Sequence, residues 1–429
     1  MFRVAVASLV AALTCACNNS STPSSPPPAS GEHHPQPALA QPAAASTAPP
    51  VPSKPGLVEG SSVRPHHEEV VVECPAKIAD TADDDTRVGL LLEEANKQIE
   101  AASYSAAWTC ADRAADLSPQ SVEANHLRAA ALAGLGRDGD AQVAYQLALA
   151  LDPDDPETLR AVADFYINGK GERGRDALRL GLVLAERGSR RVIARRHRNA
   201  PLAADLAVLE AQALNDLGHS DEALDRVDAA LRLAPGRGDA LHEKGVALFD
   251  MSKFAEAKAA FQKALGIQPD DAYTHQMLGL TLEQLRDPGA DAELDRALKL
   301  APGELSPPVM INKAEFQKEI DQVIATLAPD RAARVAKVKI EIEDLPDQAD
   351  LQAVKPPFPP TILGLYRGPV GRAPEPDDEP PSIVLYRKNL GRAVKTRSEL
   401  TEQIRDTLLH EIGHLEGLDE DDLRRRGME

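Results

Sequence analysis

The chain has 429 residues, which is longer than one ordinary domain and predicts two or three. Its 48 basic and 67 acidic residues give a formal net charge of −19, which argues against a general binder of nucleic acid or of anionic membranes. Aromatic residues make up only 3% of the chain while alanine and leucine are abundant, and this favours helices packed on helices.

Residues 1–17 are typical of an export signal. Arg3 supplies a small positive region, and the apolar run over 4–13 is too short to span a bilayer. The run leads into LTCAC, and small residues before a cysteine resemble the lipobox of bacterial lipoproteins, where the cysteine is diacylated. We expect the lipid anchor at Cys17, with Cys15 as the alternative. This interpretation places the protein in the cell envelope, facing the periplasm or the exterior; ordinary secretion and a cytosolic protein are the other options.

Residues 18–66 are rich in proline, alanine and serine, with almost no large apolar side chain. Such a segment cannot bury enough surface to offset the entropy of ordering it. We therefore predict a disordered, partly polyproline linker that holds the folded part of the chain away from the membrane.

From about residue 87 the pattern is helical and repeats. Pro119 and Pro153 are 34 residues apart, as are Pro235 and Pro269, and Pro302 follows after 33. Small residues recur in phase with these prolines and would let antiparallel helices approach closely. Alanines stand 12 and 5 residues before each proline, at Ala107, Ala141, Ala223, Ala257 and Ala290, and at Ala114, Ala148, Ala230, Ala264 and Ala297.

This pattern resembles the tetratricopeptide repeat, a 34-residue helix-turn-helix unit, over residues 87–304. We expect about six units, with a divergent unit at 156–203 that takes up the extra length between Pro153 and Pro235. The resemblance implies an α-solenoid whose concave face binds a protein partner. The repeats show no catalytic constellation.

Two cysteines accompany the first repeat. Cys74 lies just before it and Cys110 lies in its second helix. In an exported protein, a disulfide between them would pin the strand-like segment VVVEC onto the repeats and contribute about 3–4 kcal/mol. Two buried free thiols are the alternative.

Residues 305–429 differ in character from the repeats. One more amphipathic helix is predicted over 312–327, and the alternation in AKVKIEIEDLP predicts a strand. Further strands are predicted in ILGLYRG and SIVLYRKNL, and a helix in SELTEQIRDTLLHEIGH, capped by Ser398 or Thr401. These elements predict a small α+β domain that is large enough for a core of its own.

The last predicted helix contains HEIGH. On a helix, His410 and His414 share one face, so both imidazoles can reach one Zn²⁺, and Glu411 can hold a water against the metal. Gly417 lets the chain leave the helix sharply, and the acidic run at 419–422 then offers a third oxygen ligand. The simpler interpretation is a charged amphipathic helix without a metal.

The phrases IEIEDLP, ILGLYRG, SIVLYRKNL and HEIGHLEGLDEDDL, in this order, resemble a family of small bacterial zincin-like metallopeptidase domains. The resemblance implies a sheet above the helix that carries HExxH, with a cleft between them. It also implies an edge strand that binds a peptide by strand addition, for which SIVLYRKNL is our candidate.

Carried over by position, the resemblance makes His410 and His414 zinc ligands and Glu411 the general base. Gly417 matches the turn glycine of the longer motif. The third-ligand position holds Glu420, where better-known proteases have His or Asp. Two neighbouring carboxylates, Asp419 and Asp422, are the alternatives.

The mechanism implied is hydrolysis of a peptide bond by a water that zinc activates and Glu411 deprotonates. Tyr366 and Tyr386 are the tyrosines that could stabilise an oxyanion, although core packing is the simpler role for both. Our interpretation is an exported, membrane-anchored zinc metallopeptidase whose repeats recruit a protein partner or substrate. The alternative is a cell-envelope scaffold whose zincin-like domain is structural or inactive.

Overall fold

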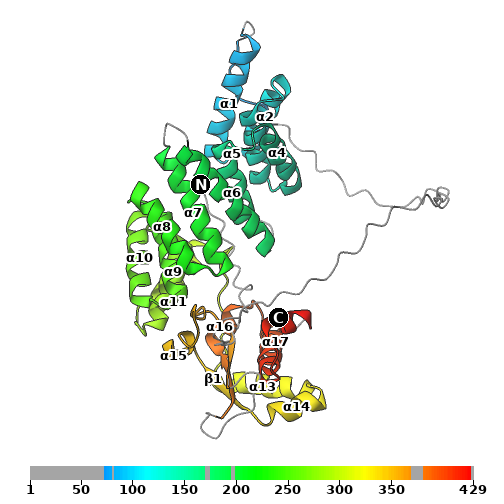
Figure 1. The fold of residues 1–429 in the computed structure, drawn as a ribbon, viewed down its shortest axis with the longest axis vertical. Helices are drawn as coiled ribbons and strands as arrows, with labels where there is room; N and C mark the ends of the chain where they lie inside the picture. Colours follow the sequence, from blue (N-terminus) through cyan, green and yellow to red (C-terminus); the bar gives the residue numbers. More distant parts are fainter. Residues whose placement is uncertain (1–71, 80–81, 170–173, 195–198, 369–379, 427–429) are drawn as a thin grey trace, which may run out of the picture. The chain divides into compact units, whose positions relative to one another are not determined.

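The computed structural model describes residues 72–426, except for 80–81, 170–173, 195–198 and 369–379 (Figure 1). The predicted signal peptide, the predicted lipid-anchor residue Cys17 and the predicted linker lie outside the described residues. Within the described part, no helix is both long enough and apolar enough to cross a membrane.

The described chain from Asp84 to Leu300 consists of consecutive helix pairs, which begin in blue and continue through green in Figure 1. This arrangement confirms the predicted fold class, a mostly α chain with a repeat solenoid. The paired helices are α1 (Asp84–Glu100) with α2 (Tyr104–Leu117), α3 (Val122–Gly134) with α4 (Asp138–Leu151), α5 (Pro156–Asn168) with α6 (Arg175–Ala194), α7 (Ala200–Leu217) with α8 (Ser220–Leu233), α9 (Gly238–Asp250) with α10 (Phe254–Ile267), and α11 (Ala272–Gln284) with α12 (Ala290–Leu300).

The in-phase alanines lie where these helices meet. All ten of them are at most 6% exposed, and most are wholly buried. A larger side chain at any of these positions would push the paired helices apart, because interiors are close-packed. The periodicity of small residues in the sequence therefore corresponds to the packing of one helix on the next.

The divergent unit contains α5 and α6. Helix α6 has 20 residues, whereas the equivalent helices α4 and α8 have 14 each, so part of the extra length is helical. The next helix, α7, already begins at Ala200 with Asn199 as its N-cap, so the predicted end of the divergent unit at 203 lies inside α7.

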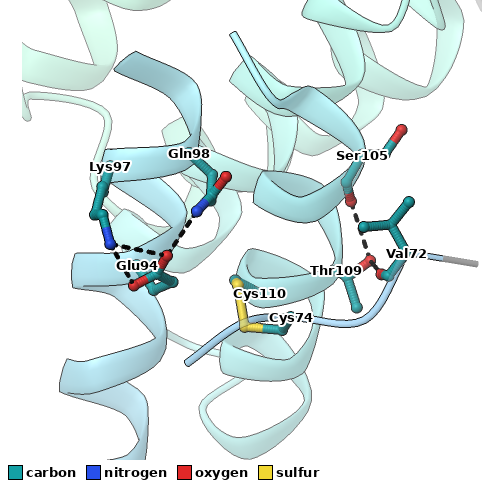
Figure 2. The surroundings of a disulfide bond; sticks show 8 residues. All are labelled: Val72, Cys74, Glu94, Lys97, Gln98, Ser105, Thr109 and Cys110. Atoms are coloured by element: carbon teal, nitrogen blue, oxygen red, sulfur yellow. Dashed lines mark hydrogen bonds and ion pairs between the residues drawn. A yellow bond between two sulfur atoms is a disulfide. The ribbon is translucent and has the colours of Figure 1, made fainter. Parts of the chain in front are cut away.

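A disulfide joins Cys74 to Cys110 of α2, with the two Cα atoms 4.9 Å apart (Figure 2). Beside it, the hydroxyl of Thr109 donates a hydrogen bond to the carbonyl of Val72 at 2.8 Å. The predicted disulfide is confirmed and the free-thiol alternative is wrong. The segment around Cys74 is not a strand. It is attached to α2 through the side chains of Cys110 and Thr109 and does not form the backbone hydrogen bonds of a sheet.

The C-terminal part combines helices with a three-stranded sheet and runs from yellow to red in Figure 1. Its elements are α13 (Lys313–Thr326), α14 (Pro329–Val335), β1 (Lys339–Glu343), α15 (Gln348–Leu351), β2 (Gly364–Arg367), β3 (Ser382–Tyr386), α16 (Arg387–Arg392), α17 (Arg397–Leu415) and α18 (Glu420–Arg425). The predicted strands and helices of this α+β domain are thus present.

The strand β3 lies in the centre of the sheet, in the order β1-β3-β2. It pairs in parallel with β1, where Ile340 is opposite Ile383, and antiparallel with β2, where Leu365 is opposite Val384. The prediction that SIVLYRKNL is an edge strand is therefore wrong. All residues of β3 are buried, and a continuous apolar run is typical of a strand covered on both faces.

The two faces of β3 belong to different cores. Ile383 and Leu385 share a cluster with α13 and with Leu408 of α17. Val384 and Tyr386 share a second cluster with residues of α9, α10 and α11, such as Phe249, Phe261 and Leu282. Since side chains alternate along a strand, one side of the sheet packs on the HExxH helix and the other on the repeats.

A buried ion pair also joins α11 to α16. The Glu283 side chain is 6% exposed and accepts hydrogen bonds from Lys388, at 2.8 Å, and from Arg392. The last repeats and the sheet domain are therefore held together by charge as well as by apolar contact.

The helix α17 begins at Arg397, one residue before the start of the predicted helix at Ser398. Its N-cap is Thr396, whose hydroxyl accepts from the backbone N–H of Glu399, and the Glu399 carboxylate accepts in return from Thr396. This is a complete capping box, so the predicted caps at Ser398 and Thr401 are wrong. The Thr401 hydroxyl instead contacts Glu319 of α13 at 2.8 Å.

Candidate metal centre

The HExxH residues lie together inside the protein. His410, Glu411 and His414 of α17 are each at most 1% exposed. One helical turn separates the two histidines, and their Nε2 atoms are 3.1 Å apart. The helix thus turns two imidazole nitrogens toward the same point, and Glu411 is the next residue after His410.

A backbone carbonyl orients His414. Its Nδ1 is 3.1 Å from the carbonyl oxygen of Leu418, an atom that can only accept. We therefore assign the proton to Nδ1, which leaves the lone pair on Nε2. The contact between the two rings is then a hydrogen bond that His410 Nε2 donates to His414 Nε2.

The Leu418 carbonyl is brought into place by the turn that ends α17. Gly417 has a φ of +81°, the left-handed conformation that glycine adopts without steric cost. The backbone N–H of Leu418 donates to the carbonyl of Gly413, and that of Gly417 donates to His414. This is a Schellman motif, so the glycine that marks the motif in the sequence also positions the group behind the histidine.

The geometry of the two histidines fits zinc. Two imidazole nitrogens that bind one tetrahedral Zn²⁺ at about 2.0–2.1 Å are about 3.3 Å apart. The observed Nε2 separation of 3.1 Å is close to that value. A ring nitrogen whose opposite nitrogen donates to a carbonyl is also the usual arrangement of a metal-bound histidine.

The third ligand is not among the side chains that the structure describes. Glu420 is the first residue of α18, and its side chain lies outside the described residues. The alternative Asp419 is exposed and accepts from the backbone N–H of Asp422, while Asp422 pairs with Arg425. Among the described residues, no group of three His, Cys, Asp or Glu side chains gathers in one place.

The edge strand β2 passes directly over the HExxH face of α17. A β carbon on Gly364 would lie 2.7 Å from Cγ2 of Thr407 and 3.2 Å from Oε1 of Glu411. Glycine is therefore required for the strand to approach the helix this closely. Neither Gly364 nor Thr407 was among the sequence candidates, although a glycine inside a strand and a hydroxyl three residues before His410 were the available signals.

The two candidate tyrosines are core residues. Tyr386 lies on the repeat-facing side of the sheet, and its hydroxyl donates to Oδ2 of Asp350 at 2.9 Å. Burial and then the Asp350 charge raise the pKa of Tyr386. Tyr366 packs on the other side, in the α17 cluster, where burial raises its pKa.

Comparisons with known proteins agree with this division of the chain. Residues 335–428 match the family described as zincin-like metallopeptidase. Residues 208–272 and 242–304 match the tetratricopeptide repeat. No curated protein matches the chain.

Several solved structures are similar to the helical part. PilF of Pseudomonas aeruginosa is 14% identical, with a TM-score of 0.44 over 55% of this chain and 99% of PilF. PilW, a type IV pilus biogenesis factor, is 15% identical, with a TM-score of 0.40 over 50% of this chain and 90% of PilW. YrrB, a repeat protein with a peptide-binding site, is 18% identical, with a TM-score of 0.33 over 45% of this chain and 93% of YrrB.

Proposed function

The chain carries a tetratricopeptide-repeat region and a C-terminal zincin-like metallopeptidase domain, and from this we propose that it is an exported, membrane-anchored zinc metallopeptidase. It hydrolyses peptide bonds of a protein that its repeats recruit. The observation that carries the proposal is the pair of Nε2 atoms 3.1 Å apart on one helix face with Glu411 beside them.

His410 and His414 hold the metal, with Glu420 as the third ligand. Zinc supplies a Lewis acid for a peptide carbonyl and lowers the pKa of water to about 7. Glu411 takes the proton of the attacking water and returns it to the leaving amine. The Leu418 carbonyl keeps the His414 ring in the orientation and tautomer that this site needs.

The substrate peptide adds to β2 rather than to β3. Strand β2 is an edge of the sheet, and its Gly364 lies beside the Glu411 carboxyl. A peptide that extends the sheet at this edge runs alongside the HExxH face of α17, and its backbone hydrogen bonds fix which carbonyl approaches the metal.

Export and anchoring rest on the sequence and are supported by the disulfide. A Cys74–Cys110 bridge persists in an oxidising compartment such as the periplasm or the cell exterior. The lipid anchor is Cys17, and the repeats bind a protein or peptide on their concave face.

The competing function is an envelope scaffold in which the zincin-like domain is inactive. One observation favours it: the repeat helices form the larger part of the described chain, and a repeat stack binds a partner without any chemistry. Under this alternative, Glu411 is a buried residue without a catalytic role.

Metal content and hydrolysis separate the two functions. The purified full chain should contain about one zinc, and His410→Ala should lose it, because His414 and Glu420 alone hold the metal too weakly. Glu411→Gln should keep the zinc and the melting temperature but lower peptide hydrolysis by about 10²–10⁴-fold, the contribution of a general base.

The matched control is Glu402→Gln, which changes an exposed carboxyl on the same helix and should leave both properties unchanged. If the wild type and Glu411→Gln are equally inert across a broad peptide library, the scaffold function is correct.

A further inference from the structure

Thr407 is a buried hydroxyl on the HExxH face that the proposed chemistry does not use. It lies on α17, one turn before Glu411 and three residues before His410, and it is fully buried. Its Oγ1 has no hydrogen-bond partner in the described part of the chain. A buried hydroxyl without a partner lowers stability, so its presence at this position requires a reason.

Two other helical threonines of this chain have a carbonyl of the preceding turn within hydrogen-bond distance of the hydroxyl. Thr281 donates to the carbonyl of Met277 at 2.7 Å, and Thr401 donates to the carbonyl of Arg397 at 3.2 Å. This bond to the preceding turn is the ordinary solution for a threonine in a helix. Thr407 does not make it, although the backbone around it is regular helix.

The methyl group of Thr407 and the carboxyl of Glu411 both face Gly364. The β carbon that Gly364 lacks would be 2.7 Å from Thr407 Cγ2 and 3.2 Å from Glu411 Oε1, so both atoms border the same small space over the strand. A 120° rotation about χ1 moves the hydroxyl of threonine into the staggered position that its methyl group occupies, and moves the methyl group into the position of the β hydrogen. That rotation would place Oγ1 toward the Glu411 carboxyl, in the space that is open because Gly364 has no side chain.

We propose that Thr407 is a positioning residue of the metal centre, whose hydroxyl turns toward Glu411 and donates a hydrogen bond to its carboxylate when the site is loaded. The inference rests on the proposed function. Held at one oxygen by Thr407, the carboxylate presents its other oxygen to the water whose proton it takes.

The inference has a consequence for stability that is independent of activity. If the hydroxyl bonds to Glu411 when metal is bound, as proposed, loading should stabilise the wild type by more than metal binding alone. Thr407→Val keeps the shape and removes the hydroxyl. It should raise the melting temperature of the metal-free full chain and show a smaller zinc-induced rise than the wild type. Thr407→Ser, which keeps the hydroxyl, should show the wild-type rise.

The matched control is Thr281→Val, at a fully buried threonine of α11 whose hydroxyl is bonded within its own helix. It should lower the melting temperature equally with and without zinc. An equal zinc-induced rise in the wild type and in Thr407→Val would overturn the inference, and so would a full chain that takes up no zinc.

Kinetics provide the second measurement. Thr407→Val should lower kcat at least about tenfold, the factor expected for a hydrogen bond to a charged group, and leave KM within about twofold. Thr407→Ser should recover most of kcat. An unchanged kcat in Thr407→Val contradicts the inference. If the wild type cleaves no peptide but the zinc-induced rises differ as expected, the proposed function fails and the role of Thr407 stands.

Discussion

Gly364 marks the closest approach between the sheet and the HExxH helix. Its missing side chain leaves room for Thr407 and Glu411 on one side, and a β carbon would also come within 3.2 Å of the backbone carbonyl oxygen of Val384. Backbone atoms of a central strand cannot move aside easily, so the strain of a larger residue would fall on the HExxH face.

Gly364→Ala should therefore destabilise the domain by about 1–3 kcal/mol through overpacking, and it should reduce zinc uptake because α17 must shift. Thermal unfolding and metal analysis of the full chain measure both effects. Gly266→Ala is the control, since Gly266 is exposed in α10 and a β carbon added there would meet no atom within 4 Å, and it should gain about 0.4–1 kcal/mol. Equal stability of the two variants would contradict the close approach.

The spacing of residues in the sequence was sufficient to predict that the two histidines lie together. It was not sufficient to predict which residues surround them. The four-residue interval between His410 and His414 dictates a shared helix face, and the turn glycine Gly417 could be identified beside it. The relation of Thr407 to Gly364 depends on a strand more than forty residues away in the sequence, which no local periodicity reveals.

The elements of the C-terminal domain were predicted better than their order in space. Alternation and apolar runs located β1, β2 and β3, but nothing in SIVLYRKNL states how many neighbours the strand has. The uninterrupted apolar run IVLY was the signal for a central strand in the sequence. The last four residues of that phrase are helical because Tyr386 ends the strand and α16 begins at Arg387.

The ion pair between α11 and α16 should contribute to stability, because the side chains of both partners are mostly buried. Glu283→Ala leaves Lys388 and Arg392 without their shared carboxylate, with side chains only 27% and 14% exposed. Removing one partner of a mostly buried pair should cost about 3 kcal/mol in the free energy of unfolding, measured by urea denaturation of the full chain.

The comparison for this variant is Asp270→Asn. Asp270 is 73% exposed and pairs with Arg296 on the surface of the same repeats, so its loss should change stability little. A similar loss in the two variants would show that Glu283 does not join the last repeats to the sheet domain.

In the part of the chain that the structure describes, the repeats and the domain that carries the candidate metal site share a hydrophobic core. The sheet side chains Val384 and Tyr386 complete a core with α9, α10 and α11, so the last repeats are part of the support of the domain that carries α17. Two separate domains could be predicted from the sequence. Their common hydrophobic core could not be predicted. The apolar pattern of each domain does not indicate which of its residues contact the other domain.

We propose that Cys17 anchors the whole molecule to the membrane. Cys17→Ser should move the protein from the membrane fraction to the soluble fraction, since the lipid cannot be attached. Fractionation of cells that express each form measures this, and Glu411→Gln is the control because it leaves the N-terminal signal intact. Unchanged partition of Cys17→Ser would reject this residue as the anchor.

The disulfide also determines which helix receives a pulling force that acts on the chain N-terminal to Cys74. A pull on the chain N-terminal to Cys74 passes through the sulfur–sulfur bond into Cys110, and the hydrogen bond from Thr109 to Val72 shares it. The tension thus reaches α2 directly and bypasses α1, which belongs to the closed loop. The first helix of the solenoid therefore bears no force from the N-terminal segment and cannot be peeled from the stack while the bridge is intact.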